Sequence, residues 1–150
     1  MILDDYLETA VRAALDAGRE ILAVYETDFR VEKKSDDSPL TLADQRAHEA
    51  IAKALKPLGL PLLSEEGRDI PFEERKQWQR FWLVDPLDGT KEFIRRNDEF
   101  TVNIALIEDN RPIMGVVYVP VQDSLYFAAK PVGAFKLEQA RDIYQKWTGQ

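Results

Sequence analysis

The sequence predicts an α+β fold in which helices come first and a mostly antiparallel sheet follows. Two long segments near the start place apolar residues at three- and four-residue spacing, which is typical of helices that bury one face. Later in the chain the pattern changes to short apolar segments separated by turn residues, which is typical of strands and hairpins. Helices followed by a run of strands make an α+β arrangement. The 150 residues suit one domain, residues 1–150.

The first helix is expected over residues 3–25, where its apolar positions are Leu3, Leu7, Val11, Ala14, Ile21, Leu22 and Tyr25. Residues 29–31 then indicate a short strand, and residues 35–39 form a polar loop because Ser, Asp and Pro favour turns. A second helix is expected from about residue 41 to residue 55, since a proline and a glycine follow it closely.

Six further segments read as strands. They lie at residues 60–63, 81–84, 101–107, 113–119, 124–129 and 134–137. Residues 67–80 are polar and are expected to be peripheral, and residues 108–111 form a hairpin turn. The tail from residue 138 to residue 147 has a weak helical pattern.

Charge and composition exclude several functions. The net charge of −7 argues against a nucleic acid polymer as partner, although a small anionic substrate remains compatible if cations mediate the contact. The chain has no cysteine, so it has no thiolate chemistry or disulfide. The N-terminus lacks the shape of a signal peptide, and the longest apolar stretch is too short for a transmembrane segment. We expect a cytoplasmic protein and leave open a peripheral position at the inner membrane.

The most informative segment is Asp-Pro-Leu-Asp-Gly-Thr at residues 85–90. An apolar strand ends there in an acid, and the following residues are those of a turn. One interpretation is a solvated turn with no chemical role. The other is that Asp85, Asp88 and the carbonyl of Leu87 surround one hard cation, because Mg²⁺ prefers oxygen ligands and retains several waters.

Glu65 also follows a short apolar strand. A lone pair of acids would normally be an exposed loop, but two strands that each end in acids favour a shared site. If Glu65, Asp85 and Asp88 converged within about 4 Å, each pair would cost about 4 kcal/mol at an effective dielectric of about 20. The three acids therefore either stay apart or hold cations.

Asp44 has two interpretations. Together with Thr41 it fits a capping box that opens the second helix. Alternatively, it hydrogen-bonds Thr90 and orients the hydroxyl of that residue. Gly89, Thr90 and Lys91 could begin a helical turn whose N–H groups face a phosphate. His48, the single histidine, is interpreted as a surface or packing residue.

Three segments together resemble the inositol monophosphatase superfamily of Mg²⁺-dependent, lithium-sensitive phosphatases. They are residues 38–44 (Ser-Pro-Leu-Thr-Leu-Ala-Asp), residues 63–66 (Leu-Ser-Glu-Glu) and residues 82–93 (Trp-Leu-Val-Asp-Pro-Leu-Asp-Gly-Thr-Lys-Glu-Phe). The resemblance covers nearly the whole chain, in the right order. It implies the N-terminal part of the layered αβαβα sugar-phosphatase-like fold, with the C-terminal layers of that fold absent from this chain.

Within the superfamily, the continuation Lys-Glu-Phe-Ile at residues 91–94 and the run at residues 96–105 resemble bacterial 3′(2′),5′-bisphosphate nucleotidases of the CysQ type. That resemblance implies hydrolysis of 3′-phosphoadenosine 5′-phosphate to AMP and phosphate, a step associated with sulfur assimilation. Inositol monophosphatase or fructose-1,6-bisphosphatase activity is one alternative. A truncated, non-catalytic fragment that binds metal is another.

Carried over to this chain, the resemblance implies that Glu65, Asp85 and the Leu87 carbonyl bind one Mg²⁺, and that Asp85 and Asp88 bind a second. Glu65 and Thr90 would hold the attacking water, with Asp44 behind Thr90. The complete site would hold two or three ions, with Mn²⁺ as a substitute. Family members supply a further aspartate from a Trp-Asp pair in a C-terminal half, and this chain contains no such pair. A homo-oligomer is left open.

Overall fold

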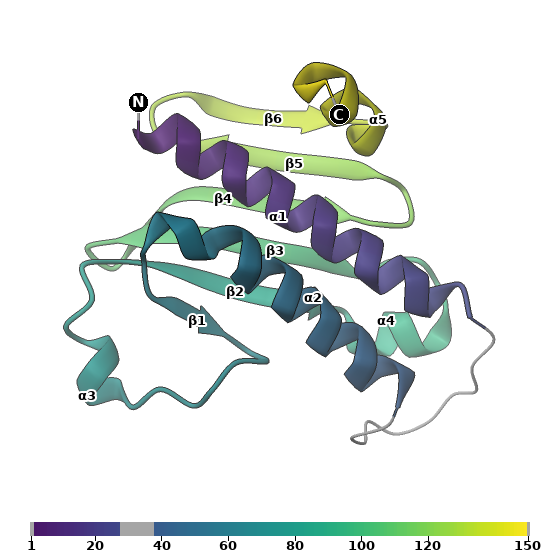
Figure 1. Cartoon of the computed structure of the whole chain (residues 1–150), viewed down its shortest axis with the longest axis horizontal. Helices are drawn as coiled ribbons and strands as arrows, with labels where there is room; N and C mark the ends of the chain where they lie inside the picture. Colours follow the sequence, from purple (N-terminus) through teal and green to yellow (C-terminus); the bar gives the residue numbers. More distant parts are fainter. Residues whose placement is uncertain (1, 28–37, 150) are drawn as a thin grey trace.

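The computed structural model describes residues 2–27 and 38–149. It has two layers, a pair of long helices and a six-stranded sheet (Figure 1). The helices are α1 (Ile2–Tyr25) and α2 (Pro39–Leu55), and both lie across the same face of the sheet. The α+β prediction is therefore confirmed. The strand expected at residues 29–31 lies outside the described residues, as does most of the polar loop expected at 35–39.

The sheet follows the chain in order, from β1 at one edge to β6 at the other. Its strands are β1 (Leu62–Ser64), β2 (Arg80–Asp88), β3 (Thr101–Glu108), β4 (Arg111–Val119), β5 (Ser124–Ala129) and β6 (Gly133–Leu137). β1 pairs with β2 in parallel, and every other neighbouring pair is antiparallel. The six strands predicted from residue 60 onward are all present, with β2 extending further at its end than expected.

The connections match their turn chemistry. Asp109 and Asn110 both have positive φ angles, as a two-residue hairpin turn between β3 and β4 requires. α2 ends in a short 3-10 turn, η1 (Lys56–Leu58), followed by Gly59 in the left-handed conformation. The polar segment after β1 contains the short helix α3 (Phe72–Arg75), and the tail forms α5 (Ala140–Thr148).

The start of α2 differs from the prediction. The helix begins at Pro39, and the hydroxyl of Ser38 accepts a hydrogen bond of 3.0 Å from the backbone N–H of Thr41. Ser38 is therefore the N-cap, and Pro39 occupies the first helical position, where its missing N–H costs nothing. The capping box expected for Thr41 and Asp44 is wrong, since both residues lie inside the helix.

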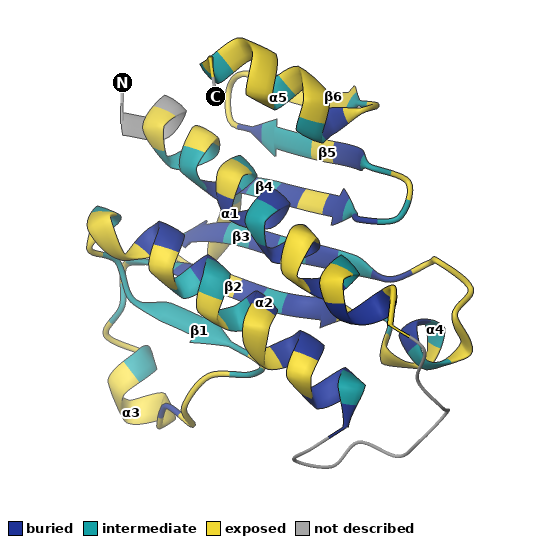
Figure 2. Ribbon diagram, turned by 45° about the vertical axis from the view of Figure 1, so that its right-hand side comes forward, coloured by how far each residue is buried: buried dark blue, intermediate teal, exposed yellow. Residues whose placement is uncertain are grey.

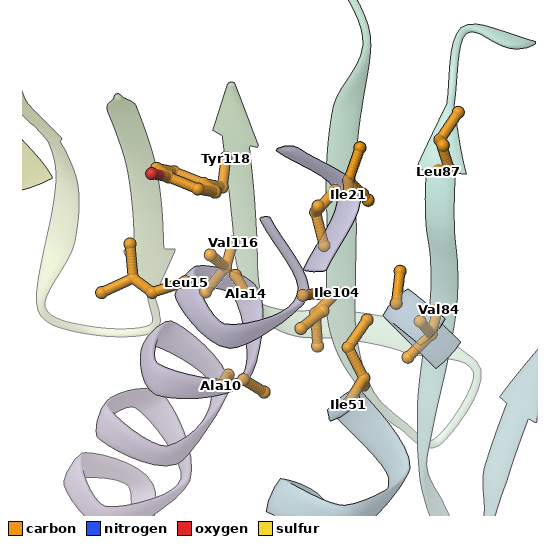
Figure 3. Close-up of a cluster of buried hydrophobic side chains, with 14 of the residues drawn as sticks. Ala10, Ala14, Leu15, Ile21, Ile51, Val84, Leu87, Ile104, Val116 and Tyr118 are labelled. Atoms are coloured by element: carbon orange, nitrogen blue, oxygen red, sulfur yellow. The ribbon is translucent and has the colours of Figure 1, made fainter. Parts of the chain in front are cut away.

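The core lies between the helices and the sheet. Ala10, Ala14 and Ile21 of α1 lie in one buried cluster with Ile104 of β3 and Val116 of β4 (Figure 3). Small residues on α1 let the helix approach the sheet closely. Figure 2 shows the consequence, with buried residues on the sheet-facing sides of α1 and α2 and exposed residues along their outer sides.

The opposite face of the sheet is apolar, and no helix within residues 2–27 and 38–149 covers it. Strand side chains alternate between faces, so the residues next to buried Val84 and Val116 point away from the helices. Leu83, Val117 and Tyr126 are 44%, 39% and 42% exposed. None of the helices within residues 2–27 and 38–149 is long and apolar enough to cross a membrane.

Candidate active site

The acids of the candidate site lie where β1 and β2 end. Both strands run in the same direction, so their carboxyl ends meet at one edge of the sheet. The backbone N–H of Glu65 donates to the carbonyl of Val84 at 3.2 Å, which extends the pairing one residue past β1. Asp85 is the next residue on β2. The structure therefore brings Glu65 beside Asp85.

A β-bulge places Asp85 and Asp88 on the same side of β2. Asp85 pairs with Asn103 and Asp88 pairs with Thr101, so three steps along β2 match two along β3. Pro86 and Leu87 are consecutive buried residues, whereas Asp85 is half-buried and Asp88 is exposed. In a regular strand residues three apart would face opposite sides. The segment was expected to leave the strand as a turn, and it instead stays paired through the bulge.

Asp85 is the electrostatic centre of this group. Partial burial and the nearby carboxylates of Glu65, Asp88 and, more weakly, Asp44 raise the pKa of Asp85 to about 6. The backbone N–H of Leu87 donates to the Asp85 carboxylate and opposes the rise. Three acids thus act on the Asp85 carboxylate, although they come from α2, the end of β1 and β2.

Asp88 has a partner that the sequence did not reveal. The side-chain amide of Asn103 donates to the Asp88 carboxylate at 2.9 Å, and the hydroxyl of Thr101 donates to the Asn103 side-chain oxygen at 3.1 Å. This chain of contacts fixes the orientation of both the amide and the carboxylate. Asn103 had appeared only as part of a family-like run, because its role depends on the pairing of β2 with β3.

Asp44 is 1% exposed, in the second turn of α2. One helical turn later, Nδ1 of His48 lies 2.9 Å from the hydroxyl oxygen of Ser64, at the end of β1. His48 was predicted to be a surface or packing residue; it is half-buried and, in addition, contacts the strand that leads to Glu65. The only signal in the sequence was its four-residue spacing from Asp44, which puts both residues on one helix face.

Gly89, Thr90 and Lys91 lie at the start of α4 (Thr90–Arg95), which packs against α2. Gly89 has φ of +97°, and a Cβ there would lie 3.2 Å from the Cα of Phe100, so glycine is required. The predicted helical turn is confirmed, and the side chains of Thr90 and Lys91 are exposed. The hydrogen bond between Asp44 and Thr90 and the contact of this turn with a phosphate stay predictions.

Aromatic packing fixes the position of α4. The rings of Tyr25, Phe93 and Phe100 lie 4.7–5.4 Å apart, centre to centre. Arg96 donates to the backbone carbonyls of Tyr25 and Thr27. It therefore anchors the end of α1.

The donor atoms suit a hard divalent ion. They are carboxylate and carbonyl oxygens, which Mg²⁺ prefers. Burial and repulsion between carboxylates together raise the Asp85 pKa, and a bound cation would relieve the repulsion. In the described part of the chain, no three Asp, Glu or His side chains are close enough to form a ready-made metal cluster. A hollow of about 350 Å³ opens beside Glu65, Asp85 and Asn103 and continues over the uncovered sheet face.

A family model for the inositol monophosphatase family matches residues 2–146. The chain belongs to the inositol monophosphatase family. Among curated members, it is 54% identical over 129 residues to the 3′(2′),5′-bisphosphate nucleotidase CysQ of Salmonella typhimurium, a match that covers 83% of this chain and 52% of the relative. It is 37% identical over 146 residues to the protein of that name from Haemophilus influenzae, covering 95% and 54%.

Solved structures of inositol monophosphatase family members share the fold. CysQ from Bacteroides thetaiotaomicron matches with a TM-score of 0.84 and 51% identity, covering 89% of this chain and 49% of that one. An inositol monophosphatase from Zymomonas mobilis matches with a TM-score of 0.74 and 29% identity, covering 90% and 51%. The chain thus spans about half the length of these relatives.

Proposed function

We propose that this chain carries the acidic half of a Mg²⁺-dependent phosphomonoester hydrolase site that removes the 3′-phosphate from 3′-phosphoadenosine 5′-phosphate. The observation that supports the proposal is the proximity of Glu65 and Asp88 to Asp85 at the ends of β1 and β2, where partial burial and these acidic neighbours raise the pKa of Asp85. A dianionic phosphate would be repelled by these groups alone, so the proposal requires cations between protein and substrate.

In the proposal, Glu65, Asp85 and the Leu87 carbonyl hold one ion, and Asp85 and Asp88 hold a second. The bulge in β2 supports this division because it presents both aspartates on one side. The full site would take two or three Mg²⁺, with Mn²⁺ able to replace them. When bound, such ions supply positive charge to the phosphate and acidify a water molecule.

The chain's own residues position the reactants. Glu65 and Thr90 hold the attacking water, and Asp44 orients the Thr90 hydroxyl from the adjacent helix. Gly89 and Lys91 lie where α4 begins and present N–H groups and one positive charge to the phosphate. Attack is in line, with no covalent bond between enzyme and phosphate.

The nucleotide substrate is supported by the CysQ relatives at 50–54% identity. Family members of the inositol monophosphatase type are more distant, at 29% identity for the Zymomonas mobilis protein. Sulfur assimilation and lithium sensitivity belong to this same proposal, as do a cytoplasmic location and association into a homo-oligomer.

Phosphate release tests the function. We expect the 150-residue chain to release phosphate from 3′-phosphoadenosine 5′-phosphate slowly and only with Mg²⁺. Its kcat/KM for this substrate should exceed that for inositol 1-phosphate, since specificity is a ratio of these constants. A ratio that favours the inositol ester would contradict the nucleotide assignment.

A second candidate is a metal-binding fragment without turnover. The observation that favours it is the length of the chain, about half that of its relatives. The test is made under conditions in which the full-length Salmonella typhimurium relative is active. If this chain binds Mg²⁺ there and releases no phosphate, the second candidate is correct.

A further inference from the structure

One polar contact joins the helix that carries Asp44 to the turn that carries Glu65. Nδ1 of His48, on α2, lies 2.9 Å from the hydroxyl oxygen of Ser64, the last residue of β1. His48 and Ser64 are both half-buried, so this contact is partly shielded from water. We call it the His48–Ser64 bridge.

The Ser64 hydroxyl also organises the turn itself. It accepts a hydrogen bond of 3.3 Å from the backbone N–H of Glu66, while the Ser64 carbonyl accepts one of 3.2 Å from Gly67. A hydroxyl has one donor and two acceptor positions, so Ser64 can serve Glu66 and His48 together. Glu65 lies in the middle of this turn.

The imidazole ring also packs against the turn. A Cβ built on Gly67 would lie 3.3 Å from Cε1 of His48, so the ring occupies the space beside that glycine. On the other side, Glu65 is tied to β2 by its N–H bond to Val84. The turn is therefore held by its own hydrogen bonds, by β2 and by α2.

His48 lies four residues after Asp44, and side chains with that spacing share one helix face. Asp44 is close enough to Asp85 to raise its pKa, and Glu65 does so more strongly. The bridge therefore sets the distance between two elements whose acids act on the same carboxylate.

We propose that His48 is a positioning residue, which acts through Ser64 to hold Glu65 in place relative to Asp44 and Asp85. This inference rests on the proposed function, because it assigns the bridge to the metal-dependent site. Groups behind metal ligands fix the orientation of those ligands, and their loss typically lowers metal affinity or activity about 10–100-fold.

The first experiment needs no metal. Amide hydrogen exchange at Glu65, Glu66 and Gly67 is measured in metal-free wild type, His48→Ala and Ser64→Ala. We expect faster exchange at these amides in both variants, because the turn opens more often once the bridge is lost. His48→Asn should restore protection, since its amide places a polar atom near the position of Nδ1. Unchanged exchange in both alanine variants would overturn the proposal.

The second experiment measures the Mg²⁺ concentration that gives half of the maximal rise in melting temperature. We expect a rise in this midpoint of about 10–100-fold in each alanine variant, and no further rise in the double variant, because both changes remove one contact. Glu49→Ala, an exposed change on the same helix, is the control. A midpoint in His48→Ala equal to that of wild type, despite faster exchange, would make the bridge purely structural and overturn the positioning role.

The two proposals fail in different ways. If wild-type protein shows no response to Mg²⁺ at all, the proposed function is contradicted and the positioning role falls with it, even where amide exchange confirms the bridge. If wild type responds and the variants respond equally, the function stands and the positioning role is wrong.

Discussion

At the scale of single residues, the backbone holds several carboxylates near one another although they repel each other. Asp85 is partly buried and lies near the carboxylates of Glu65 and Asp88. Burial and these like charges raise its pKa to about 6. The sequence singled out these acids as candidates. It gave no sign of Asn103 beside Asp88 or of Ser64 beside His48, because each of these contacts joins residues 15 or 16 positions apart through the tertiary fold.

The raised pKa predicts how pH changes the stability of the metal-free protein. The pKa of Asp85 moves from 3.8 when unfolded to about 6 when folded, so the folded state binds the proton more tightly. Its contribution to stability is complete below pH 4 and is lost as the pH rises through 6. We expect Asp85→Asn to raise the melting temperature at pH 7.5, with a gain that shrinks toward pH 4.

The control for this prediction is Asp109→Asn, in the exposed hairpin turn between β3 and β4, where asparagine tolerates the positive φ. It should leave the pH profile of melting unchanged. A melting temperature of Asp85→Asn that is below wild type at pH 7.5 would show that repulsion at this carboxylate is not what destabilises the metal-free site.

A substitution at Asp44 distinguishes a catalytic role of this residue from a structural one. The structure removes the capping explanation, since Ser38 caps α2. Asp44→Asn keeps the shape of this buried side chain, so we expect the melting temperature to change little. We expect phosphate release with Mg²⁺ to fall about 10–100-fold, as for other groups that orient a site. If the turnover of Asp44→Asn is close to that of wild type, Asp44 has only a packing role.

At the scale of elements, periodicity was enough to place the two long helices and the six strands of the sheet, but not enough to place their ends. Ser38 and Thr41 each precede a polar residue three positions later, so both fit the start of a helix. Pro39 decides between them, because it suits the first helical position. The bulge at residues 85–88 depends on how β2 pairs with β3, and no local pattern in β2 contains that information.

The contact of α1 with the sheet gives a prediction at this scale. A Cβ on Gly18 would overlap a ring carbon of buried Tyr118. Gly18→Ala should therefore destabilise the protein by about 1–3 kcal/mol through overpacking, although alanine favours the helix by about 1 kcal/mol. Chemical denaturation measures the change.

Tyr118→Leu provides the control, because it shortens the side chain that Gly18→Ala would strike. The two changes together should cost less than the sum of the single changes, as expected for residues in contact. If the losses in the free energy of unfolding are additive, the close approach of α1 to β4 is not the reason that residue 18 is glycine.

At the scale of the whole molecule, the helices cover one face of the sheet and leave the other open. Leu83, Val117 and Tyr126 lie on the open face, which continues from the acids at the end of β2. Exposed apolar faces of this kind favour association. The fold class and the succession of strands along the chain followed from the sequence. The parallel pairing of β1 with β2 did not, because it joins strands separated by 15 residues of polar chain.

We expect the isolated chain to self-associate through this open face. Sedimentation velocity should show a mass that rises with protein concentration, and Val117→Lys should keep the chain monomeric. Phe72→Ser, an equally apolar and more exposed site on α3, is the control and should not change association. A wild-type chain that remains monomeric at high concentration would contradict this prediction.

The central claim is that Glu65, Asp85 and Asp88 hold a divalent cation, and Mg²⁺-dependent melting tests it most directly. A ligand at ten times its dissociation constant adds about 1.4 kcal/mol of stability, which raises the melting temperature of a chain of this size by about 3–6 °C. The account predicts such a rise with Mg²⁺ in wild type and none in Asp85→Ala. A wild type that does not respond, or an Asp85→Ala variant that responds as fully as wild type, would contradict it.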